Sequence, residues 1–277
     1  MTEDAPRSNA RAWLARLFAV VLVAVWIYVR FVPEDAKAAG FTIPEEYEAV
    51  EGDVVTLRTN GDGGERLARD AREAWRAAAA WLEATPDARG LVFVASDLDA
   101  YNRLGLEWRG GHQSSNCYAF STPWRDAGDV DSAGVALGHD DPVRARIHVW
   151  HATAEQFLDR LRGPAREPLP PWLKNGLAAY LSRFTTPDLT EWSLDRLRGS
   201  APFDAARFLR EYAPDEQRIV TAGAIVAFLR SDSASDAARG AFVAAVGRLR
   251  DGDEAAFAPL ADAVVAEQEA LREFLGG

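Results

Sequence analysis

Two short motifs in the middle of the chain hold the residues that could do chemistry. The first is His-Ala-Thr-Ala-Glu, from His151 to Glu155, and the second is Trp-Leu-Lys-Asn-Gly-Leu-Ala-Ala-Tyr, from Trp172 to Tyr180. Residues four apart lie on one side of a helix, so the His151 and Glu155 side chains can approach a single point. An imidazole and a carboxylate at this spacing are typical of a metal-binding site or an acid–base site.

Helix signals surround both motifs. Asp141 is a good N-cap and Pro142 a good first residue for a helix that we expect to run to Arg162, where a Gly-Pro pair ends it. A proline-rich linker at residues 168–171 then leads into a second predicted helix, residues 172–184. We therefore expect the two helices to pack together, with His151 and Glu155 facing Asn175 across a cleft.

The other elements predict an α+β fold, with an N-terminal α/β half (residues 41–140) and a helical half (residues 141–277) that begins with the helix of the first motif. The first half should hold a small sheet and two helices, one of them short and capped at Ser96 with Asp99 in a capping box. The expected strands are residues 54–58, 91–95, 117–121 and 134–137, and the longer helix is residues 65–83. Four or five more helices and no strand are expected after Asp188.

The N-terminus predicts attachment to a membrane. Residues 13–32 are apolar except for Arg16 and Arg30 near the two ends, and about 20 residues are enough to span a bilayer. We expect residues 1–12 to be a short cytoplasmic tail, residues 13–32 the anchor and residues 33–40 a linker. The alternative is a signal peptide cleaved near Ala36-Lys37-Ala38. Both place the body outside the cytoplasm, in the periplasm or at the cell surface.

Composition excludes one class of partner. The formal net charge is −11, and a surface so acidic repels phosphate backbones, so nucleic acid is not expected as a partner. Cys117 is the sole cysteine, which excludes an intrachain disulfide.

The two motifs resemble those of the gluzincin, or peptidase MA-like, zinc metallopeptidases. That family has His-Glu-x-x-His on one helix and Trp-Leu-x-Glu-Gly-Leu-Ala-x-Tyr on the next. Both histidines and the glutamate of the second helix hold zinc, and the glutamate of the first motif deprotonates the zinc-bound water. The resemblance implies a cleft between the two helices, and it extends over most of the chain from about Phe41.

This chain departs from the family pattern at three of its four functional positions. His151 takes the first-ligand position, but Ala152 replaces the base, Glu155 the second histidine and Asn175 the third ligand. We therefore expect no catalytic residue, no metal ligand set and no cofactor. The vestigial cleft that the resemblance implies would be lined by His151, Ala152, Glu155, Asn175 and Tyr180.

Two other groupings remain open at this stage. His148 and His151 lie three apart on the same predicted helix and could belong to a rebuilt metal site. Cys117 and His112 share a loop rich in glycine and serine and could act as nucleophile and base, although nothing supplies a third orienting group.

The leading hypothesis is a membrane-anchored, extracytoplasmic pseudopeptidase whose cleft binds a peptide or a protein partner. One rival is an active zinc hydrolase with an atypical ligand set, and the other is a structural domain without a ligand.

Overall fold

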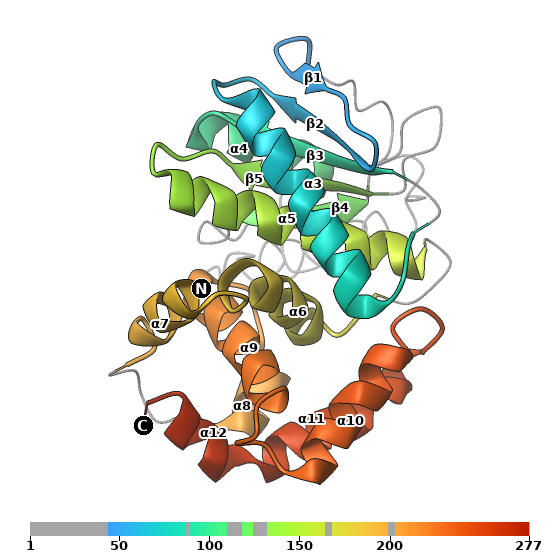
Figure 1. Ribbon diagram of the computed structural model, residues 1–277, viewed down its shortest axis with the longest axis vertical. Coiled ribbons are helices and arrows are strands. Elements are labelled where there is room, and N and C mark those ends of the chain that lie inside the picture. Colours follow the sequence, from blue (N-terminus) through green and yellow to red (C-terminus); the bar gives the residue numbers. More distant parts are fainter. Residues whose placement is uncertain are drawn as a thin grey trace, which may run out of the picture. The chain divides into compact units, whose positions relative to one another are not determined.

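The first half of the chain forms one mixed sheet in the order β1-β2-β3-β5-β4 (Figure 1). The computed structural model describes residues 44–86, 89–109, 118–123, 132–163, 168–198 and 203–276. Its strands are β1 (Glu48–Val50), β2 (Val55–Thr59), β3 (Gly90–Ala95), β4 (Ala119–Pro123) and β5 (Ser132–Leu137). The three inner strands are parallel and both edge strands are antiparallel to their neighbours. The four expected strands are confirmed, whereas the three-residue β1 was too short to predict.

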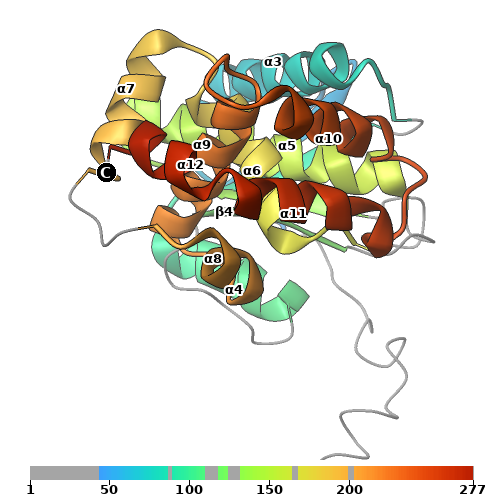
Figure 2. The same ribbon diagram turned by 90° about the horizontal axis from the view of Figure 1, so that it is seen from below.

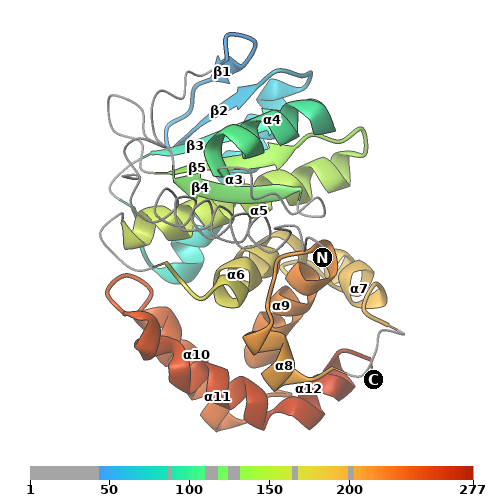
Figure 3. The same ribbon diagram turned by 180° about the vertical axis from the view of Figure 1, so that it is seen from behind.

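Helices cover both faces of the sheet. α3 (Gly64–Leu82) and α5 (Pro142–Arg162) contact one face, and α4 (Leu98–Arg109) lies on the other, as Figures 1 and 3 show from opposite sides. Every residue of β3 except Gly90 has an apolar side chain, and all of these side chains are buried. This is typical of a central parallel strand with helices on either side.

The ends of two helices test the predicted caps. The Asp141 side chain accepts a hydrogen bond from the Val143 amide at 2.9 Å, so the predicted start of α5 is confirmed. The predicted capping box at Ser96 is wrong. Asp97 is the cap of α4, since its Oδ1 accepts a hydrogen bond from the Ala100 amide at 2.8 Å. The helix is therefore capped one residue later than predicted, by Asp97 and not by Ser96.

The second half is entirely helical in the residues that are described. It continues with α6 (Pro171–Arg183), α7 (Pro187–Asp195), α8 (Ala205–Arg210), α9 (Glu216–Leu229), α10 (Asp236–Gly247), the 3-10 helix η1 (Glu254–Phe257), α11 (Ala258–Ala266) and α12 (Gln268–Phe274). α10 and α11 lie side by side (Figure 2). The described chain is thus α+β and mostly helical, as expected.

The number of C-terminal helices was underestimated. Six α-helices, α7 to α12, follow in the described residues where four or five were expected. One boundary falls at Glu267, which ends α11 and starts α12 without a proline or glycine to mark it. A change of direction at an ordinary helix-forming residue leaves little signal in the sequence.

Two hydrophobic cores meet at α5 and α6. One core lies between the sheet, α3 and α5, and the other fills the helical half. Neighbouring residues of α5 pack into different cores: Phe157 packs into the core beneath the sheet, and Leu158 packs into the core of the helical half. On α6, Leu181 packs into the core beneath the sheet and Leu177 into the core of the helical half. Both helices are therefore buried around most of their circumference, which explains their weak amphipathic patterns.

The predicted anchor (residues 13–32), its flanking tail and linker, Cys117 and His112 all lie outside the described residues. Within the described ranges, no helix combines the length and the apolar composition that crossing a bilayer requires.

Close packing of α6 on α9 depends on Gly176. A Cβ atom at this position would lie 2.9 Å from the Ala222 carbonyl oxygen and 3.2 Å from Val226 Cγ2. We expect Gly176→Ala to lower the free energy of unfolding by about 1–3 kcal/mol, because backbone atoms must move apart. Gly240→Ala is the matched control, since a Cβ at this exposed helical position meets nothing within 4 Å. It should raise stability by up to about 1 kcal/mol. Urea denaturation of both variants measures the two effects, and equal shifts would contradict this account.

Candidate functional site

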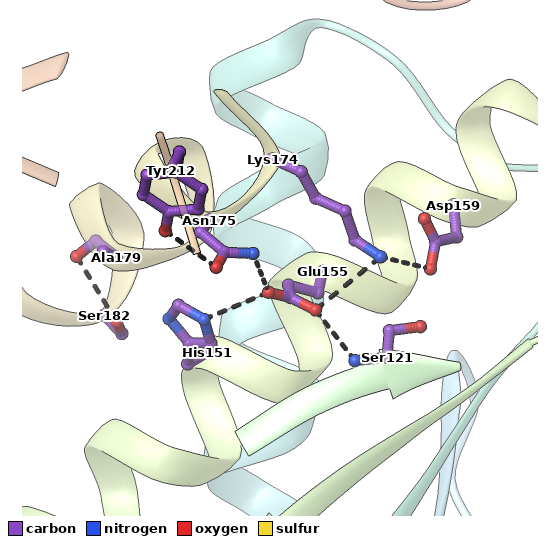
Figure 4. A network of polar contacts seen from close by, with 9 residues as sticks. All are labelled: Ser121, His151, Glu155, Asp159, Lys174, Asn175, Ala179, Ser182 and Tyr212. Atoms are coloured by element: carbon purple, nitrogen blue, oxygen red, sulfur yellow. Dashed lines mark hydrogen bonds and ion pairs between the residues drawn. The ribbon is translucent and has the colours of Figure 1, made fainter. Parts of the chain in front are cut away.

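A buried carboxylate lies where α5 crosses α6. Glu155 of α5 is 3% exposed, and Figure 4 shows it at the centre of a polar network. Its Oε1 accepts from Asn175 Nδ2 on α6 at 2.6 Å and from His151 Nε2, one turn earlier on α5, at 3.2 Å. Three of the residues chosen from the sequence are thus in direct contact. They touch each other, however, and do not face one another across an open cleft.

The second oxygen of the same carboxylate is also satisfied. Glu155 Oε2 accepts from the Ser121 backbone amide of β4 at 2.8 Å and lies 3.6 Å from Lys174 Nζ. Lys174 in turn contacts Asp159 Oδ2 at 2.8 Å. Residues of an edge strand and of two helices therefore converge on one side chain (Figure 4).

The network keeps this buried carboxylate ionised. Burial raises the pKa of Glu155, but the nearby Lys174 ammonium, the His151 imidazole and the Ser121 amide together outweigh burial and lower the pKa to about 2. A carboxylate accepts and does not donate, so His151 must carry a proton on Nε2.

Tyr212 fixes the orientation of the Asn175 amide. Its hydroxyl donates to Asn175 Oδ1 at 2.9 Å, which leaves Nδ2 directed at Glu155. Sequence reasoning missed Tyr212, which lies in the short segment between α8 and α9 and belongs to no motif. Ser121 and Lys174 were also missed. Of the three, only Lys174 carried a signal, because it adjoins Asn175 within the second motif.

Ala152 and Tyr180 do not join this network. Ala152 is fully buried in the core beneath the sheet, and a Cβ on Gly134 of β5 would lie 2.8 Å from its carbonyl oxygen. The Tyr180 hydroxyl accepts from Arg230 Nη1 at 2.9 Å, and its ring lies against Trp81 with centroids 5.3 Å apart. The resemblance placed both in the cleft, but the base position is part of the apolar packing and Tyr180 belongs to a separate contact.

A cavity of about 700 Å³ lies beside the network, lined by residues of α4, β5, α5, α6, α7 and α9. A much smaller space of about 20 Å³ shares Tyr118, His148 and Arg183 with it and reaches His151. His148 Nδ1 lies 2.8 Å from the Leu137 carbonyl oxygen and so donates to it. Burial lowers the pKa of His148 to about 4, which keeps this imidazole neutral near pH 7.

The chemistry of these groups does not favour a metal. Among the three side chains that meet at Glu155 Oε1, only His151 and Glu155 are common metal ligands, and Asn175 adds a neutral amide. No group of three His, Cys, Asp or Glu side chains that could hold a metal ion occurs within the described ranges. The contacts of His148 are those of a buried neutral histidine with a backbone partner.

Comparison with known proteins adds no family to this picture. No protein-family model matches the chain, and none of the curated proteins matches it.

The low pKa of Glu155 predicts a specific acid sensitivity. As pH falls, the unfolded chain binds this proton near pH 4.5 and the folded chain only near pH 2. The stabilisation is therefore complete above pH 4.5 and disappears toward pH 2, with a total of about 3 kcal/mol. We expect Glu155→Gln to be less stable than wild type at pH 7 and the difference to shrink from pH 4.5 to pH 2.

Denaturation curves over this pH range test the expectation. Glu269→Gln is the control, because that carboxylate side chain is 84% exposed and should give a nearly constant difference. A Glu155→Gln difference that is equally constant would show that the network does not hold the carboxylate ionised.

Proposed function

We propose that this protein is a membrane-anchored, extracytoplasmic pseudopeptidase of gluzincin type that binds a peptide or a protein partner and does not hydrolyse it. The observation that carries the proposal is the bonding of Glu155. Glu155 stands at the second-ligand position, and its carboxylate contacts the side chains at the other two positions, His151 and Asn175. Its other oxygen accepts from the Ser121 amide and lies near Lys174, so both oxygens are already engaged.

Binding of zinc would require this network to be dismantled. His151 Nε2 would have to lose the proton that it donates to Glu155, and Asn175 would have to turn its oxygen away from Tyr212. Lys174, 3.6 Å from the same carboxylate, would add electrostatic repulsion against a cation. A site of this kind favours the metal-free state.

The lack of a catalytic base at position 152 also supports a protein that does not hydrolyse its ligand. Hydrolysis through a zinc-bound water needs a carboxylate at position 152, where this chain has alanine. Ala152 lies within the apolar core against β5, so a longer polar group there would be buried without a partner.

A binding role is supported by the cavity beside the network. Its volume suits a small ligand or a few residues of a peptide, and the smaller space that shares residues with it reaches His151. A zinc hydrolase with an atypical ligand set and a structural domain without a ligand are the rival functions.

We expect the full chain to contain no stoichiometric zinc when it is purified without a metal-affinity tag. Elemental analysis measures this directly. One zinc per chain that is lost in His151→Ala would defeat the proposal and favour the hydrolase alternative.

Restoring two of the ligands tests whether the site descends from a zinc centre. The double variant Glu155→His with Asn175→Glu supplies two imidazoles and one carboxylate from α5 and α6, while Ala152 stays because of its burial. We expect this variant to bind about one zinc per chain, without peptidase activity. The control is Glu155→His alone, which supplies the two imidazoles of α5 without a third ligand from α6 and should bind zinc much more weakly. Zinc uptake by the control alone, or by neither folded variant, would contradict the assigned positions.

Anchoring by residues 13–32 is a further part of the proposal. After cells that express the full chain are fractionated, we expect the protein in the membrane pellet even after a high-salt wash. Solubilisation should need detergent, because burial of an apolar helix does not depend on ionic strength. A soluble form that begins near Ala39 would show instead that the segment is a cleaved signal peptide.

A further inference from the structure

We infer that the cavity beside the Glu155 network binds the carboxylate of an apolar ligand, such as the free C-terminus of a peptide. This inference rests on the proposed function, since it names the ligand chemistry of a cleft that binds and does not cleave.

The charge of the cavity has the opposite sign to that of the chain. Arg144, Arg183 and Arg196 line it, whereas Glu216 is the only carboxylate among its described lining residues. The histidines at its edge add no fixed negative charge. Arg144 lies 3.8 Å from Asp141, so the three arginines still outnumber the two carboxylates beside them, Asp141 and Glu216. In a chain with a formal net charge of −11, this local positive charge attracts anions.

Two of these arginines are held in place by one glutamate and one tryptophan. Arg196 Nη1 donates to Glu216 Oε1 at 2.5 Å, and its guanidinium lies 3.8 Å from the Trp192 ring centroid. Arg183 Nη2 lies 3.9 Å from the same glutamate oxygen, and its guanidinium is 5.8 Å from the same ring. A guanidinium has five N–H donors in a planar fork, so one bond to Glu216 does not exhaust the donors of Arg196.

The two histidines add hydrogen-bonding groups of opposite kind. His148 donates through Nδ1 to Leu137 and is neutral, so its Nε2 is an acceptor. The exposed His139 accepts from the Asp141 amide through Nδ1 at 2.9 Å, so the proton of its neutral form is on Nε2. An acceptor beside cationic groups matches a ligand that has an N–H close to its carboxylate, as the last residue of a peptide does.

Apolar side chains complete the cavity. Leu98, Ile147, Leu197 and Val220 line it together with the Trp192 ring, and Leu98 is 48% exposed. Ile147, Leu197 and Val220 are already buried, but Leu98 and the half-buried Trp192 ring keep surface that a purely inorganic anion would leave in contact with water and that an apolar C-terminal side chain would cover. Guanidinium groups with an apolar lining and an acceptor thus favour a ligand with a carboxylate, an amide N–H and an apolar side chain.

The test compares two peptides that differ only in their last group. Full-length protein in detergent is titrated into Ala-Ala-Ala-Phe labelled with fluorescein at its N-terminus, with either a free carboxylate or a C-terminal amide, and polarisation is measured. We expect the free acid to bind at least about tenfold more tightly than the amide, because charge-assisted hydrogen bonds are lost in the amide. N-acetylphenylalanine and inorganic phosphate are added as unlabelled competitors.

Variants locate the interaction. Arg196→Gln and Arg144→Gln each remove one cation from the cavity lining, and each should weaken binding of the free acid about tenfold with little effect on the amide. Arg198→Gln is the matched control, because that side chain is 63% exposed, pairs with Asp195 and does not line the cavity. Circular dichroism checks that all three variants fold.

The possible results separate this inference from the proposed function. Equal binding of acid and amide would overturn the carboxylate inference while leaving a peptide-binding pseudopeptidase intact. Displacement of the labelled acid by N-acetylphenylalanine at a lower concentration than by the unlabelled tetrapeptide acid would support the carboxylate site and indicate a small organic acid as its ligand. Phosphate that competes as well as N-acetylphenylalanine would overturn the inference that the ligand has an apolar side chain. If no probe binds, the inference fails, and the zinc measurement still decides the pseudopeptidase proposal by itself.

Discussion

Charge compensation of one buried carboxylate is the constraint on which the centre of this molecule depends. Burying an ionised Glu155 without partners would cost more free energy than the net stability of a typical domain, so each of its oxygens needs hydrogen-bond donors. Those donors come from β4, from the preceding turn of α5 and from two adjacent residues of α6. The sheet and the helical half are therefore joined by polar contacts as well as by apolar packing.

The packing around this network explains how a polar cluster is accommodated between two cores. α5 and α6 each present apolar residues to both cores, and the Glu155 network lies along the line where the two helices touch. Glycines permit the close approach that this arrangement needs. Gly134 lets α5 lie close to β5 near Ala152, and Gly176 lets α6 lie close to α9. A distance greater by one methyl group would separate Glu155 from its partners, since hydrogen bonds weaken steeply with distance.

The sequence predicted those parts of the structure that local signals determine. The aspartate cap and the proline at its start placed α5, the four-residue spacing placed His151 beside Glu155, and the resemblance of the second motif pointed to Asn175. It did not predict Ser121 or Tyr212, because their contacts join positions 34 and 37 residues apart and depend on tertiary packing. It also placed Tyr180 in the cleft, although Asn175 and Tyr180 are five residues apart and so face different sides of one helix.

The polarity of the hydrogen bonds distinguishes this centre from a metal site of similar geometry. A metal ion needs lone pairs directed at its position from every ligand. Here, an imidazole N–H, an amide NH₂ and an ammonium are directed at a carboxylate, so most of the surrounding groups present protons and only the central one presents lone pairs. Tyr212 strengthens this pattern by occupying the one oxygen that Asn175 could offer to a cation. The anion that the site needs is thus already supplied by the chain itself, in the form of Glu155.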